Sequence, residues 1–111
     1  MIGVVFQFAS EVIEVRVDKA NILFRTVSTN GGFATIDNLK LDHQGVLKEH
    51  PDLKGNKEWR KETIKRFKNK IKEMPSEAES INYIIEDLTK YGYKAQYVQR
   101  AGYRPIKLNN G

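Results

Sequence analysis

The chain has 111 residues and a formal net charge of +5 at pH 7, with 40% hydrophobic and 30% charged residues. This length and balance are typical of one ordinary globular domain and exclude a disordered chain, so we expect a single domain over residues 1–111. Cysteine is absent, which excludes disulfides, thiolate metal ligands and a cysteine nucleophile.

The N-terminal segment has no pattern of export or membrane insertion. Its apolar run is too short for a signal sequence or a membrane span, and the first basic residue is Arg16. We therefore expect a cytoplasmic protein that makes no membrane contact.

The N-terminal half has the residue pattern of β-strands. Three segments alternate apolar and polar positions or are rich in β-forming residues: Ile2–Phe8, Glu11–Val17 and Ile22–Ser28. Asn30-Gly31 is a hairpin signal, because both residues accept positive φ, and it predicts a fourth strand from Phe33 to Ile36. This half therefore predicts a four-stranded antiparallel meander.

The C-terminal half has the pattern of two amphipathic helices followed by a strand. A first helix is predicted from Lys57 to Glu73, before Pro75. Ser76 and Glu79 form a capping box for a second helix, which ends before Gly92. Tyr93–Val98 is predicted to return as a strand, with Tyr103–Leu108 as a last extended piece at an edge.

These elements predict an α+β fold. An antiparallel sheet, made of the N-terminal four-stranded meander plus a C-terminal strand, carries two helices packed on one face. Each helix has a single apolar side, so we expect the opposite sheet face to be solvated or used for binding.

Positive charge is concentrated in two blocks. Residues 51–73 hold nine basic and four acidic side chains, and residues 92–111 hold four basic side chains and no acidic ones. Within the first helix, five lysines recur every three or four residues along one side: Lys57, Lys61, Lys65, Lys68 and Lys72. This lysine stripe predicts a phosphate-bearing partner, because each neutralised phosphate releases counterions. The alternative is a solvated face on which Glu58 and Glu62 relieve the repulsion.

The C-terminal segment contains the second candidate surface. Its most interaction-like residues lie around Gly102 and beyond it: Arg100, Tyr103, Arg104 and Lys107. Tyrosine can stack on bases while cations hold the nucleic-acid backbone. The alternative is that Tyr91, Tyr93 and Tyr97 pack in the core, as we expect for Tyr91, and that Arg104 blunts a sheet edge, while Tyr103 fits either role. Trp59 lies at the edge of the apolar side of the first predicted helix, so we expect it to be partly buried.

No motif defines an enzyme. The two histidine–carboxylate pairs, Asp42-His43 and Glu49-His50, lack a recognised ligand spacing, so we expect no catalytic residue, no metal and no cofactor. We predict a small non-catalytic nucleic-acid-binding module, with DNA or RNA as partner, that uses the lysine stripe and the C-terminal segment. The alternative is a protein-interaction or oligomerisation module, in which the stripe faces an acidic protein or the acidic second helix of another copy.

Overall fold

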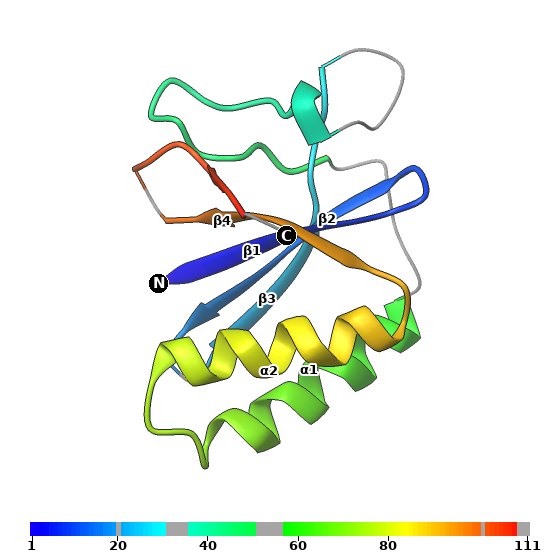
Figure 1. Cartoon of the computed structure of the whole chain (residues 1–111), viewed down its shortest axis with the longest axis vertical. Helices are drawn as coiled ribbons and strands as arrows, with labels where there is room; N and C mark the ends of the chain where they lie inside the picture. Colours follow the sequence, from blue (N-terminus) through cyan, green and yellow to red (C-terminus); the bar gives the residue numbers. More distant parts are fainter. Residues whose placement is uncertain (20, 31–35, 51–56, 101, 109–111) are drawn as a thin grey trace.

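An antiparallel β-sheet lies at the centre of the protein, with helices α1 and α2 on one of its faces (Figure 1). The computed structural model describes residues 1–19, 21–30, 36–50, 57–100 and 102–108. Their elements are β1 (Ile2–Phe8), β2 (Glu11–Asp18), β3 (Asn21–Thr26), η1 (Ile36–Asn38), α1 (Lys57–Ile71), α2 (Glu77–Lys90), β4 (Lys94–Gln99) and β5 (Ile106–Lys107). The described strands form one five-stranded sheet in the order β3-β2-β1-β4-β5, which confirms the predicted α+β fold.

The described part of the N-terminal meander contains β1, β2 and β3. Each pairs with the next in antiparallel register, and β4 pairs with the other side of β1. The predicted hairpin at Asn30-Gly31 and the strand Phe33–Ile36 fall largely on residues 31–35, which lie outside the described residues. Ile36 itself begins the short 3₁₀ helix η1.

The main core lies between the sheet and the two helices. Alternate strand residues meet the inner sides of α1 and α2, and the most deeply buried of these are Val4, Phe6, Ile13, Val15, Phe67, Ile84 and Leu88. α1 contacts β3, whereas α2 contacts β4, β1 and β2. This arrangement places α1 beneath one edge of the sheet and α2 beneath its middle (Figure 1).

The two ends of α2 follow the predicted capping pattern. The Ser76 hydroxyl accepts a hydrogen bond from the backbone N–H of Glu79 at 3.3 Å. At the other end Gly92 has φ +94°, and the N–H of Tyr93 donates to the Leu88 carbonyl at 3.1 Å. Local sequence therefore fixes where this helix begins and ends.

The second sheet face is also covered, so the expectation that it would be solvated or used for binding is wrong where residues 36–50 cross it. Leu47, from that segment, is buried against a second small core with Val5, Val12 and Val27. Backbone hydrogen bonds hold the segment to the end of β3, one from Ser28 N–H to the Lys48 carbonyl at 2.8 Å. Figure 1 shows the segment as the layer opposite the helices.

A buried ion cluster lies under the same segment. The Glu14 side chain is fully buried, and its Oε1 accepts hydrogen bonds from the Nε atoms of Arg16 and Arg25, both at 2.8 Å. Arg25 also donates from Nη2 to the Leu47 carbonyl at 3.0 Å. The carboxylate fits because Gly3 has no side chain: a Cβ there would lie 2.7 Å from Glu14 Oε2. The cluster therefore ties the covering segment to the sheet.

Candidate nucleic-acid interface

The lysine stripe is an exposed surface that faces away from α2. All five of its lysines are exposed, and none of the ion pairs formed between described residues uses a lysine. The Arg66–Asp87 ion pair at 2.6 Å and the Trp59–Tyr91 ring contact mark the side of α1 that faces α2. The buried residues of α1, Thr63, Phe67 and Ile71, face the sheet. Helical periodicity places the lysines on the flank of α1 that is opposite the flank facing α2. Neither Glu58 nor Glu62 takes part in these ion pairs, so none of the pairs relieves the repulsion between the lysines.

The C-terminal residues predicted for the same interface lie elsewhere. Arg100, Tyr103, Arg104 and Lys107 are all exposed, Tyr103 at 69%. However, they flank the β4–β5 edge of the sheet, whereas α1 lies against β3 at the opposite edge. Arg104 lies instead beside Gly45 of the covering segment. The structure therefore does not join the lysine stripe and the C-terminal residues into one surface.

A pocket of about 210 Å³ opens where α1 begins, α2 ends and β1 turns into β2. We call it the aromatic pocket, and its lining residues are Phe8, Glu11, Trp59, Arg60, Tyr91 and Tyr93. Phe8 and Tyr91 are 48% and 50% exposed, whereas Tyr93 is buried. The expectation that Tyr91 packs in the core is therefore wrong, because this residue caps the end of α2 at the surface.

Ring contacts and one glycine hold the pocket in place. Trp59 stacks on Tyr93 with ring centroids 5.8 Å apart and meets Tyr91 edge-on at 5.7 Å. The Phe8 ring packs against the end of α2 because Gly92 has no side chain: a Cβ there would lie 2.6 Å from the ring. Trp59 is partly buried, as predicted. The aromatic rings of the pocket are therefore arranged before any ligand arrives.

The polar wall of the pocket is an ion pair. Arg60 Nη2 donates to Glu11 Oε1 at 3.1 Å and to the Thr26 hydroxyl at 2.8 Å. The Glu11 side chain is 35% exposed, so its carboxylate remains open to a ligand. Three lysines are next to lining residues in the sequence and bring positive charge to this end of the molecule: Lys61, Lys90 and Lys94. The surroundings therefore favour a ligand that combines flat apolar groups with negative charge.

Burial raises the pKa of Tyr93 to about 12, with a smaller contribution in the same direction from Glu11. An unfolded tyrosine titrates near pH 10, so the neutral hydroxyl stabilises the fold below about pH 10, and this contribution is lost as the pH rises towards 12. We expect phenolate absorbance to show one of the five tyrosines ionising near pH 12, and Tyr93→Phe to remove that step. Ionisation of all five near pH 10 would contradict this assignment.

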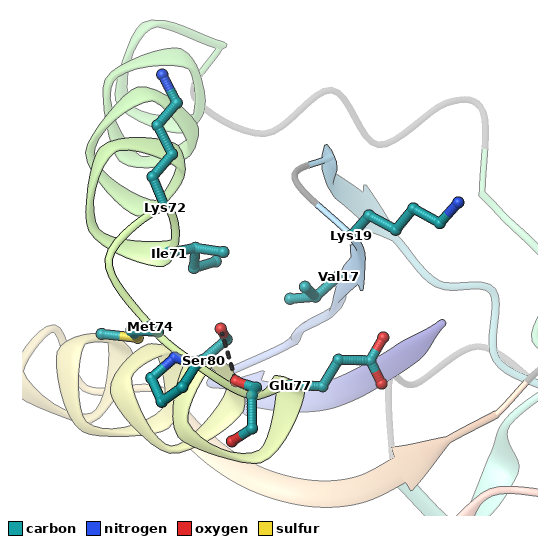
Figure 2. A pocket seen from close by; sticks show the side chains of 9 residues that line it. Val17, Lys19, Ile71, Lys72, Met74, Glu77 and Ser80 are labelled. Atoms are coloured by element: carbon teal, nitrogen blue, oxygen red, sulfur yellow. Dashed lines mark hydrogen bonds between the residues drawn. The ribbon is translucent and has the colours of Figure 1, made fainter.

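A second pocket, of about 280 Å³, lies where α1 turns into α2 and includes Lys72 of the stripe (Figure 2). Its floor is apolar, and the Ser80 hydroxyl donates to the Ser76 carbonyl at 3.2 Å. Figure 2 shows the side chains of Lys19 and Lys72 pointing away from each other. Their charges do not converge, so this pocket is a weaker candidate than the aromatic pocket.

Asp42, from one of the two histidine–carboxylate pairs, makes hydrogen bonds within its own loop. Asp42 Oδ1 accepts the backbone N–H groups of Val46 and Gln44, at 3.0 and 2.7 Å, and these hydrogen bonds lower its pKa. The carboxylate therefore shapes a turn. Within the described ranges, no group of three or more histidine, aspartate and glutamate side chains could hold a metal ion. The described helices include none that is long and apolar enough to cross a membrane.

Comparison with known proteins does not identify the function. The sequence matches no protein family, and it has no significant match among curated proteins or solved structures. Function is therefore argued from the geometry of the lysine stripe and the aromatic pocket.

Proposed function

We propose that this protein is a small non-catalytic module that binds single-stranded nucleic acid along α1. The observation that carries the proposal is that the first turn of α1 contributes to both surfaces: Trp59 and Arg60 line the aromatic pocket, and Lys57 and Lys61, on either side of them in the sequence, belong to the lysine stripe. Lysines can hold phosphates while Phe8 and Tyr91 offer half-exposed rings to bases. Only unstacked bases can reach such rings, which favours a single strand.

The charge of α1 supports a phosphate backbone as the partner. The helix carries seven basic and two acidic residues over 15 positions, a length of about 22 Å. Like charges three or four residues apart each cost about 0.2–0.5 kcal/mol. A chain of regularly spaced phosphates relieves this repulsion along the whole stripe at once.

Pairing of α1 with the acidic α2 of another copy is the second candidate function. Glu79 and Glu86 of α2 are exposed and could face a basic helix. However, Asp87 already pairs with Arg66, and Glu77 lies 3.6 Å from the N-terminal amine. Internal pairs therefore use part of the acidic charge of α2, and this function has less support.

The proposal is tested by titrating short labelled DNA and RNA, single-stranded and duplex, at several salt concentrations. One variant reverses three stripe charges, by Lys61→Glu, Lys65→Glu and Lys68→Glu. The matched control reverses three charges at the opposite sheet edge, by Arg100→Glu, Arg104→Glu and Lys107→Glu. We expect single strands to bind best, and the stripe variant to bind much more weakly with a salt slope smaller by about 2, since each phosphate contact contributes about 0.7.

The control variant should keep the wild-type salt slope. An equal loss of affinity in the stripe variant and the control variant would contradict an interface confined to α1. Weak binding of every nucleic acid, independent of salt, would contradict the proposed function. Salt-sensitive dimerisation that the stripe variant abolishes would favour the second candidate.

A further inference from the structure

Glu11 is an unusual residue for a surface that binds phosphates. It provides the carboxylate among the pocket's lining residues, beside four aromatic rings. An ionised carboxylate has about four lone-pair sites, and two of them are occupied, one by the Arg60 hydrogen bond to Oε1 at 3.1 Å and one by a hydrogen bond from the Tyr93 hydroxyl. With 35% of the side chain exposed, Glu11 can accept further hydrogen bonds from a ligand.

The size of the pocket limits what this carboxylate can contact. Pockets for drug-sized ligands span about 300–1,000 Å³, so a pocket of about 210 Å³ suits a smaller flat group such as one base. Phe8 and Tyr91 are accessible at its surface, and the buried Tyr93 lies deeper. A base inserted between the exposed rings would turn one edge towards Glu11.

The bases differ in what they offer to a carboxylate. On its Watson–Crick edge, guanine carries two adjacent donors, N1–H and the N2 amino group, which match the two oxygens of a carboxylate in parallel hydrogen bonds. Adenine and cytosine each place a ring acceptor beside their amino donor, and thymine and uracil flank one donor with two carbonyl acceptors. Those acceptors would face the negative charge of Glu11.

We propose that the aromatic pocket is a base-binding subsite that prefers guanine, with Glu11 accepting hydrogen bonds from its N1–H and N2 amino groups. This inference rests on the proposed function and adds a sequence preference to it. Arg60, on the same wall, carries N–H groups that suit the O6 acceptor of guanine.

A cationic ligand, such as a methylated ammonium group, is the other chemistry that suits several rings and a carboxylate. The charges around the pocket oppose it. The Arg60 ion pair already neutralises the charge of Glu11, and Lys61, Lys90 and Lys94 are each next to a lining residue in the sequence. A neutral base attached to a phosphate chain meets no such repulsion.

The test uses a short oligothymidylate in which one central position is guanine, inosine, adenine or cytosine. A single guanine prevents the strand from forming guanine quadruplexes. The wild-type protein should bind the guanine strand about 5- to 150-fold more tightly than the adenine strand, the range that one bidentate base contact gives. Inosine, which keeps N1–H and lacks the amino group, should lie between them.

Two variants assign the preference to Glu11. Glu11→Gln should reduce binding of the guanine strand to the level of the adenine strand while binding of the adenine strand persists, which also shows that the variant is folded. Glu58→Gln removes the same charge from an exposed position on α1 and should keep the preference.

The outcomes separate the two levels of the proposal. Equal, salt-dependent binding of all four strands would overturn the guanine preference and leave the proposed function standing. A guanine preference that survives Glu11→Gln would overturn the role of Glu11. Absence of salt-dependent binding to any strand would overturn both proposals.

Discussion

Glu14→Gln should lower the free energy of unfolding by about 3–5 kcal/mol, the usual result of removing one partner from a buried ion pair. The Glu14 carboxylate is fully buried and compensates two arginine charges through one oxygen. Glutamine has nearly the same shape but no charge, so Arg16 and Arg25 would remain together in the covered face of the sheet. Arg25 also holds the Leu47 carbonyl, so residues 36–50 should loosen at the same time.

Urea denaturation of Glu14→Gln and of Glu86→Gln measures this effect. Glu86 is exposed on α2, so its substitution should change the stability by no more than about 0.5 kcal/mol. A similarly small loss for Glu14→Gln would show that the buried cluster contributes little. Glutamine keeps one oxygen that can accept from both arginines, and the other oxygen of Glu14, Oε2, has no hydrogen-bond partner among the described residues. We therefore attribute the expected loss of stability to the uncompensated arginine charges and not to missing hydrogen bonds.

The regular elements could be predicted because local sequence determines them. Ser76 and Gly92 mark the ends of α2 through their own backbone chemistry, and apolar spacing gives its inner side. Strand alternation also predicts that Glu14 points to one face of the sheet while its neighbours Ile13 and Val15 point to the other. Such patterns show which way a side chain points, but they do not show what lies above it.

The cover over the second sheet face could not be predicted for that reason. Leu47 belongs to a segment with no helical or strand period, so nothing local marks it as a core residue. Burial of Glu14 depends on that cover and on the space above Gly3, which are both tertiary features. The sequence therefore identified a polar strand face without indicating that it would be buried.

The two parts of the candidate site differ in the same way. The lysine stripe follows from helical spacing alone, and its exposure agrees with the prediction. The aromatic pocket combines residues from three distant parts of the chain, near positions 8–11, 59–60 and 91–93. Phe8 and Tyr91 continue apolar patterns that point to a core, and only the end of α2 at the surface makes their rings accessible.

The double variant Phe8→Ala/Tyr91→Ala should weaken binding of single strands by at least about thirtyfold. Stacking of a base on an aromatic ring is worth about 1–3 kcal/mol, so losing two rings costs about 2–6 kcal/mol. The lysines remain in place, so the slope of binding against salt should not change. This separates stacking from charge, because the lysine variant should lower the affinity and the salt slope together.

Tyr103→Ala/Ile106→Ala is the matched control, since these side chains are 69% and 62% exposed at the opposite edge of the sheet. It removes a similar exposed apolar area, and we expect it to bind like the wild type. Loss of binding in this control alone would place the stacking surface in the C-terminal segment. A lower salt slope in the Phe8→Ala/Tyr91→Ala variant would indicate that its rings position the lysines instead of contacting bases.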